Sequence, residues 1–372
     1  MRHAMLSLAT LLALAMVQTS QAQNVPSTDV KEIEKAVNKA IEYLEKSQAA
    51  DGSFSKQTGP AVTALIATGI IKQGRPVTDP VVAKGLKFLE TYVQPDGGIC
   101  GPESNYKNYE TCLGVMAFSA ANKDGKYDKI LKDADKFLKN LQWDGEEGHD
   151  KSSPAYGGAG YGGHKRPDLS NTGFLIDALK ATGNAPDSEA MQKALIFVSR
   201  CQNLEGPNNT TPAAAKVNDG GFYYTAFGEG DSQAGKTENG GLRSYASMTY
   251  AGLKSMIFAG VKADDPRVKA AFEWSQKNYD LKSNPGMNQA GLFYYYHTLA
   301  KALDALGVDE IKDAAGNKHL WRQELVKELL SRQDPAGSWT NAEKRWMEGD
   351  PNLVTGYVLL TLSYAREKPA SK

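Results

Sequence analysis

The residues of this chain that are best suited to chemistry occur in short polar clusters at the starts of apolar segments. The candidates for catalysis are Asp168, His297, Glu348 and Asp350, and the candidates for ligand binding are Ser170, Asn171, Arg243, Tyr245, Tyr296, Arg345 and Trp346. Carboxylates, an imidazole, guanidinium groups and phenols are the groups that proteins use for acid–base catalysis and for stabilising charge. Each is also common in structural positions, because Tyr and Arg bridge packed helices and Asp caps helix starts.

The most informative cluster lies within residues 156–179. A glycine-rich loop is followed by Pro167 and by an apolar helix expected from Leu169. Glycine lets such a loop take positive φ and approach other groups closely. Asp168 or Ser170 is expected to cap the helix. Because the helix dipole stabilises an anion at this end, the sequence predicts that Asp168 is ionised near neutral pH.

A repeat organises the rest of the chain. An amphipathic segment, a turn with Gln, Gly and an aromatic residue, and a mostly apolar segment recur six times. The expected pairs are 33–44 with 61–72, 82–93 with 109–121, 130–141 with 169–181, 188–201 with 243–259, 266–278 with 296–306, and 319–332 with 352–364. The one-sided helices suit an outer layer and the apolar ones an inner layer. The sequence therefore predicts an all-α repeat fold, either an open solenoid or a closed ring.

Two long connections, residues 143–168 and 203–242, join outer to inner helices, whereas the inner-to-outer connections are short. Long loops inside compact domains are usually functional or disordered. Both run to the rim at which the inner helices begin, where backbone N–H groups point outward. We expect the candidate residues to gather at this rim.

The segment Pro167-Asp-Leu-Ser-Asn-Thr172 and the apolar helix after it resemble the catalytic segment of squalene–hopene cyclases, Pro-Asp-x-Asp-Asp-Thr. The Gln/Gly/aromatic turns resemble the Gln-Trp repeats of the same superfamily, which includes protein prenyltransferase β subunits. This resemblance implies a closed α/α toroid (α6/α6 barrel) of six outer/inner helix pairs, forming one domain over residues 23–372. It also implies a central cavity for an apolar, isoprenoid-like ligand. Ser170 and Asn171 stand where the family has its second and third Asp, and the second is its proton donor.

Three functions remain open at this point. One is an enzyme of terpene cyclase or prenyltransferase type, an isomerase, lyase or transferase in which Asp168 is the residual acid. Another is a non-catalytic toroidal binding or interaction protein, which the missing Asp residues favour. A third is a polysaccharide-acting enzyme, because α/α toroids also hold glycans between Tyr and Trp side chains. A fold alone does not decide among them.

No metal or cofactor is expected. The segment Tyr296-His297-Thr298 resembles the helix that carries the zinc-binding His of prenyltransferase β subunits, but the Asp-x-Cys pair of that family is missing. Its nearest substitute, Glu110-x-Cys112, would lie across the ring from His297, too far to share an ion. Whether Cys100 and Cys112 form a disulfide stays open.

The expected partner is an apolar or isoprenoid-like small molecule. The 43 Lys and Arg residues balance the 43 Asp and Glu residues without a basic stripe, which makes nucleic acid an unlikely partner. After residue 22, no segment has the roughly 18 uninterrupted apolar residues of a transmembrane helix. The oligomeric state cannot be derived from these patterns.

Residues 1–22 have the pattern of a signal peptide: Arg2 near the start, an apolar run over residues 4–17, and the small residues Ser20 and Ala22. We therefore expect an exported protein, periplasmic or secreted.

This interpretation predicts cleavage after Ala22. N-terminal sequencing of the exported protein should begin at Gln23. Recovery of the intact Met1 terminus from soluble cytoplasm would contradict the prediction.

Overall fold

The computed structural model describes residues 30–162 and 166–366, and the expected signal peptide, residues 1–22, lies outside these ranges. The helices are α1 (Val30–Ser47), α2 (Ala61–Lys72), α3 (Pro80–Glu90), α4 (Lys107–Ala121), α5 (Asp128–Lys139), α6 (Leu169–Ala181), α7 (Glu189–Arg200), α8 (Pro212–Val217), α9 (Ala246–Phe258), α10 (Pro266–Lys277), α11 (Leu292–Leu306), α12 (Trp321–Ser331) and α13 (Pro351–Ala365). Two 3-10 turns, Lys56–Thr58 and Arg345–Met347, and a two-stranded hairpin of β1 (Ile311–Lys312) and β2 (Lys318–His319) complete the described elements.

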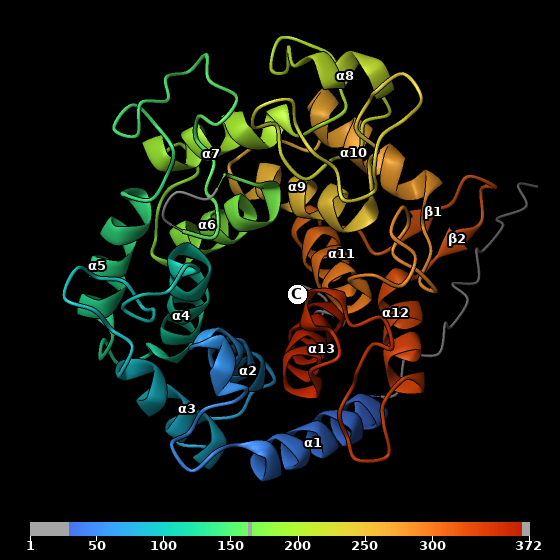
Figure 1. Ribbon diagram of the computed structural model, residues 1–372. Helices are drawn as coiled ribbons and strands as arrows, with labels where there is room; N and C mark the ends of the chain where they lie inside the picture. Colours follow the sequence, from blue (N-terminus) through green and yellow to red (C-terminus); the bar gives the residue numbers. More distant parts are fainter. Residues whose placement is uncertain (1–29, 163–165, 367–372) are drawn as a thin grey trace, which may run out of the picture.

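The helices form two concentric rings, seen along the ring axis in Figure 1. The inner ring is α2, α4, α6, α9, α11 and α13, and each of these helices packs against the next. Contact between α13 and α2 closes the ring. The outer ring is α1, α3, α5, α7, α10 and α12. The predicted all-α toroid of six outer/inner pairs is therefore confirmed.

The distribution of apolar residues explains which helices are inside. In α5, the buried residues Leu131, Ala134 and Leu138 form one stripe, and lysines occupy the other side. In α9, every residue from Ala246 to Met256 is buried. A helix that is buried on all sides must be surrounded by other helices, whereas a one-sided helix can face water.

Two small elements were not anticipated. Helix α8 lies in the long connection of residues 203–242, and the hairpin of β1 and β2 joins α11 to α12. Six-residue helices and two-residue strands are too short to show a hydrophobic period. Pro212 at the start of α8 and the left-handed Asn218 at its end mark its limits.

Four of the repeated turns tie their helix pair to the following outer helix through a Gln side chain. The Gln142 Nε2 atom donates to the carbonyl of Gly157 in its own turn region (2.9 Å) and to that of Ala190 in α7 (3.0 Å). Gln48 and Gln202 make the same double contact. Gln333 completes the circle, since its Nε2 atom donates to Gly337 and to Ala36 of α1. Each of these amides links a carbonyl of its own turn to a carbonyl of the neighbouring outer helix, and so sets the register of neighbouring pairs.

Glycine is required in these turns for two reasons. Gly52, Gly97 and Gly337 have φ of 89°, 96° and 104°, which L side chains rarely adopt. In addition, a Cβ at Gly52 would lie 2.3 Å from the carbonyl oxygen of Lys84 in α3. The expected reversal of the chain at these glycines is confirmed, and it occurs against the backbone of the neighbouring outer helix.

We predict that Gly52→Ala costs about 3 kcal/mol or more in the free energy of unfolding, because backbone strain and a backbone clash add. Gly74→Ala is the matched control: Gly74 has the same φ of 89°, but no atom within 4 Å of an added Cβ. It should cost only about 1–2 kcal/mol. Denaturant unfolding of both variants measures the difference, and equal losses would show that the turn does not need this close approach.

Candidate functional site

A cavity of about 640 Å³ lies at the rim where the inner helices begin. Residues near the starts of all six inner helices line it, for example Val62 of α2, Phe174 of α6 and Tyr357 of α13. Its aromatic lining consists of Tyr106, Tyr109, Tyr161, Phe174, Tyr224, Tyr245, Tyr294, Trp346 and Tyr357. The cavity therefore lies at the rim to which the long connections run.

The lining is mostly apolar, and its charged side chains are acidic. Among the described residues that line the cavity, the acidic ones are Glu110 and Glu348. None of these lining residues is Lys, Arg or His. Burial raises the pKa of Tyr109, Tyr161 and Tyr294 above the ordinary value of a phenol. These phenols are therefore neutral groups that can donate and accept hydrogen bonds.

The phenols pair with one another and with neighbouring side chains. The hydroxyl groups of Tyr294 and Ser170 are 2.8 Å apart. Tyr109 forms a hydrogen bond with Tyr357, and its ring meets Phe174 edge-on at 5.1 Å. Such contacts hold the aromatic wall in one arrangement.

The glycine-rich loop positions Tyr161. The carbonyl of Tyr161 accepts the N–H of Asn108 (3.0 Å) at the start of α4, and the Asn108 Nδ2 atom donates to Gly160 (2.8 Å). A Cβ on Gly162 would lie 2.8 Å from the backbone nitrogen of Lys107. The glycines thus allow the loop to cap α4 at close range while the Tyr161 side chain lines the cavity.

Asp168 is the N-cap of α6 and does not line the cavity. Its Oδ1 atom accepts the backbone N–H of Asn171 (2.8 Å), and its Oδ2 atom accepts the Asn171 side-chain amide (2.8 Å). The carboxylate also forms a hydrogen bond with Tyr224, whose side chain lines the cavity. Asn171 itself is buried and does not line the cavity. Ser170 is the member of this cluster that reaches it.

Burial raises the pKa of Asp168 to about 6, although hydrogen bonds from Asn171 and Tyr224 act in the opposite direction. The group is thus mostly ionised at pH 7. The helix dipole and the local N–H groups favour the anion, but removal from water has the larger effect.

Glu348 belongs to the loop before α13 but caps α11. Its Oε1 atom accepts the N–H of Tyr294 (2.8 Å), and the N–H groups of Leu292 and Phe293 also bond to the carboxylate. Its Oε2 atom accepts the Asn341 side-chain amide (2.7 Å). This long-range cap explains why α11 begins at Leu292, four residues before the expected start. Burial raises the pKa of Glu348.

Glu110 is the carboxyl group on the cavity wall that does not cap a helix, and it was not among the candidates. Its Oε2 atom accepts the N–H of Gly101 (3.1 Å), and Ser104 forms a second hydrogen bond. Burial raises its pKa. The Glu110 side chain packs directly against Gly59. A Cβ at Gly59 would lie 2.6 Å from Oε1, so a larger residue there would displace the carboxyl group.

The loop before α13 also supplies the mouth of the cavity. Trp346 and Met347 have left-handed backbones, with φ of 53° and 65°, and both line the cavity. They are 43% and 44% exposed. Arg345 is exposed, stacks on the Trp346 ring at 4.2 Å and does not line the cavity. Left-handed backbone at such residues is uncommon and often marks a functional segment.

Tyr245 lines the cavity, but Arg243, Asp350 and Tyr296 do not. Arg243 is exposed and donates to the carbonyl of Lys236. Asp350 caps α13 by accepting the N–H of Asn352 (2.9 Å).

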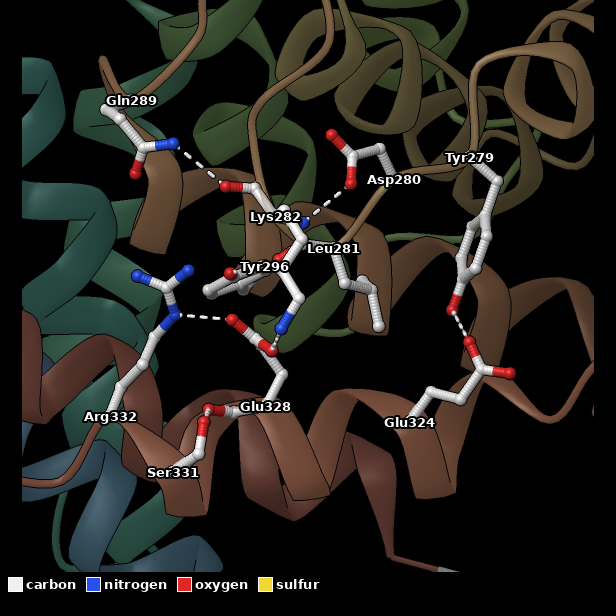
Figure 2. Close-up of polar contacts among 10 residues, drawn as sticks. All are labelled: Tyr279, Asp280, Leu281, Lys282, Gln289, Tyr296, Glu324, Glu328, Ser331 and Arg332. Atoms are coloured by element: carbon white, nitrogen blue, oxygen red, sulfur yellow. Dashed lines mark hydrogen bonds and ion pairs between the residues drawn. The ribbon is translucent and has the colours of Figure 1, made fainter.

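Tyr296 is a structural residue in α11. Its hydroxyl donates to the carbonyl of Leu281 at 2.6 Å (Figure 2). The same loop is tied to α12, because Glu328 pairs with Lys282 and accepts a hydrogen bond from Arg332 at 2.6 Å. Tyr296 therefore packs toward the outer ring rather than toward the cavity.

His297 lies below the cavity floor, between the rings of Tyr357 and Tyr364 at 5.7 and 5.9 Å. Burial, with a contribution from Lys301, lowers its pKa to about 3. The imidazole is therefore neutral at physiological pH.

Several cavity residues were not singled out as candidates, among them Tyr161, Tyr224 and Tyr357. Tyr161 and Tyr224 lie in the long connections, where no period shows which side chain points inward. Tyr357 is the seventh residue of α13, nearly two turns beyond its start, whereas the candidates lie at expected helix starts. Its position in an apolar helix was the available signal.

Within residues 30–162 and 166–366, no three His, Cys, Asp or Glu side chains lie close enough together to hold a metal ion. In the same ranges, every helix is too short or too polar to cross a bilayer. Cys100, Cys112 and Cys201 are buried and unpaired.

Fold and cavity together define a closed α/α toroid with an aromatic centre. Residues 56–226 match the family model described as the squalene-hopene cyclase C-terminal domain. The resemblance to squalene cyclases is thereby confirmed over these residues. None of the curated proteins matches the sequence significantly.

Solved structures share the fold at low identity. The type II terpene cyclase MstE from Scytonema is 14% identical, with a TM-score of 0.52 over 90% of this chain and 98% of that one. A D-mannose isomerase is 12% identical, with a TM-score of 0.55 over 91% and 97%. A glycosyl hydrolase of family 88 from Bacteroides vulgatus is 11% identical, with a TM-score of 0.51 over 90% and 98%. Likeness at this level shows the fold alone.

The site geometry predicts an unusual pH dependence for Asp168. Its pKa of about 6 in the folded protein exceeds its ordinary value of 3.8, so the folded state binds more protons between these values. Stability therefore falls as pH rises through this window, by on the order of 3 kcal/mol. Asp168→Asn removes the ionisation, so the stability of the variant relative to the unmodified protein should rise from pH 4 to 6.

Asp265→Asn is the control. Asp265 also caps a helix, but its bonds to Arg267 lower its pKa, so the relative stability of this variant should fall as pH rises toward about 4 and stay nearly constant from about pH 5 to 6. Urea unfolding at a series of pH values measures both trends. Parallel trends would show that Asp168 is not a buried ion.

Proposed function

We propose that this protein is exported and that its central cavity binds a largely apolar, uncharged ligand of isoprenoid type. The supporting observation is the aromatic lining, which has carboxyl groups but no cationic side chain among its described residues. A volume of about 640 Å³ lies within the range of ligand pockets.

The exposed apolar residues support the same proposal. Four large hydrophobic side chains are exposed in the described ranges, and three of them, Tyr106, Trp346 and Met347, line this cavity. Apolar surface kept in contact with water at the mouth of a pocket is typical of binding sites for apolar ligands.

The charge of the lining disfavours an anionic ligand. A diphosphate group would lie near Glu110 and Glu348 without a Lys or Arg among the described lining residues. Phosphate recognition relies on such cations or on N–H groups. Three N–H groups at the start of α11 are already bound by Glu348. The proposal therefore favours a neutral polyene, alcohol or triterpenoid over a prenyl diphosphate.

Binding is supported more directly than cyclisation. Asp168 does not line the cavity, so a proton from it would have to pass through the Tyr224 phenol. Two-carboxylate glycoside hydrolysis is also disfavoured, because it needs two available carboxyl groups and Glu348 is bound at both oxygens. We propose a binding protein that retains the toroid of a terpene cyclase.

The test is equilibrium binding of tritiated geranylgeraniol to the purified protein, compared with geranylgeranyl diphosphate and cellohexaose. The alcohol should bind, and the diphosphate should bind at least about 10-fold more weakly, since a charge without a partner costs more than 1.4 kcal/mol on burial. Tighter binding of the diphosphate, or binding of the sugar alone, would contradict the proposal.

Leu353→Trp should weaken binding of the alcohol at least about 10-fold, because Leu353 lines the cavity and a larger side chain occupies its volume. Leu330→Trp is the matched control, on the half-buried side of outer helix α12. Its affinity should equal that of the unmodified protein. Equal effects of the two substitutions would place the ligand elsewhere.

A further inference from the structure

A second polar site lies beneath the floor of the cavity. A void of about 20 Å³ is lined there by residues of α6, α9 and α11. We call it the lysine chamber, and its polar lining is Ser170, Asp177, Lys254, Tyr294, His297, Thr298 and Lys301. Ser170 and Tyr294 line both spaces, so their hydrogen-bonded hydroxyl groups separate the chamber from the cavity.

The charges in the lysine chamber do not balance. The Nζ atom of Lys254 lies 2.8 Å from Asp177 Oδ1, and that of Lys301 lies 2.6 Å from Asp177 Oδ2. All three residues are more than nine-tenths buried. Two ammonium groups thus share one carboxylate, which leaves one positive charge in a region removed from water. Such a charge is costly unless it is paired.

Among the described charged groups that act most strongly on this cluster, Asp177 is the only anion. The charges that act most strongly on His297 are those of Lys301, Asp177, Lys254 and Lys72. Cys112 of α4 also faces the cluster, and burial raises the pKa of its thiol well above the ordinary value.

On the α13 side, Tyr364 forms a hydrogen bond with Lys301. His297 is neutral, because its pKa is lowered to about 3. The excess charge of the cluster is therefore positive.

Hydrogen-bond donors also remain in the chamber. The ammonium group of Lys254 has three N–H donors, and two of them bond to Gly173 and Asp177. Lys301 bonds to Asp177 and Tyr364, which again accounts for two of three. The Nδ1 atom of His297 is buried and has no hydrogen-bond partner within the described protein. Buried polar atoms of this kind usually have a partner.

From this juxtaposition we propose that the lysine chamber binds one small monovalent inorganic anion of the halide class, held between the Lys254 and Lys301 ammonium groups. The small size of the void favours a monatomic anion over sulfate or phosphate. The bound anion brings the charge beneath the cavity floor to zero. This site is separate from the proposed binding of an apolar ligand and does not depend on it.

Anion binding should be linked to protonation of Lys254. Burial, together with the nearby Lys301, lowers the pKa of Lys254 to about 8 despite the attraction of Asp177. Below this pH the ammonium group is charged and the anion binds. Above it the amine loses its proton, the cluster becomes neutral and the anion is released.

The experiment is thermal unfolding of the full-length mature protein in sodium chloride, sodium bromide and sodium gluconate at equal concentration. At pH 7, chloride and bromide should raise Tm by about 2–4 °C above gluconate in a saturable way. This halide-specific rise should shrink above pH 8. Equal Tm values in all three salts at pH 7 would overturn the proposal, because a water molecule would then occupy the void.

Lys301→Met should abolish the halide-specific rise, since Asp177 and Lys254 then form a neutral pair. Lys180→Met is the control: Lys180 is exposed, lies over the Phe258 ring at 4.2 Å and does not line the chamber. The Lys180→Met variant should retain the halide-specific rise in Tm. A rise that persists in Lys301→Met would refute the assignment.

A second measurement does not depend on the stability of a variant. Crystals of the unmodified protein grown in sodium bromide should show an anomalous peak between the Nζ atoms of Lys254 and Lys301. The absence of a peak at this position would overturn the proposal, whether or not bromide is seen elsewhere in the crystal.

Discussion

The structure depends on the joint between consecutive helix pairs. At four of the joints, those of Gln48, Gln142, Gln202 and Gln333, a Gln amide bonds to a turn carbonyl and to a carbonyl of the next outer helix, beside a glycine that lies against that helix. Since the same geometry is applied repeatedly, the pairs turn around an axis until Gln333 reaches Ala36 and the ring closes. An error at one joint would be repeated in the position of every later helix.

Ring closure brings six helix starts together, and this is the origin of the cavity. Each helix contributes few residues, but together they surround a space that no single repeat could enclose. The glycine-rich loop and the loop before α13 complete the wall with Tyr161 and Trp346. A repeat protein thus forms a deep pocket from local elements, and its lining can change without altering the joints.

Polarity is distributed unevenly along the axis of the ring. The upper space is aromatic, with neutral phenols and carboxyl groups, whereas the lysine chamber below contains two ammonium groups and one carboxylate. Ser170, Phe174 and Tyr294 line both spaces, and the Ser170 and Tyr294 hydroxyl groups bond to each other. Because interactions between charges are strong in a medium of low polarity, the charge state of the chamber affects any charge that develops in the cavity above.

The sequence by itself determined the helices, their layers and the repeated turns. Leu169–Ala181 agrees with its expected limits because its cap, Asp168, is local. The glycine turns were also recognisable, since positive φ is a local requirement. Closure of the ring followed from the family resemblance rather than from the hydrophobic period.

Tertiary structure decided which side chains share the cavity. Glu348 reaches across to cap α11, Tyr224 arrives from a long connection, and Asp168 turns toward Asn171 instead of the central space. The charge states were decided in the same way: the pKa of Asp168 and the unequal pairing of Lys254 and Lys301 depend on burial by distant segments. The physical reason is that propensity and capping act within a few residues, whereas burial and convergence require the closed ring.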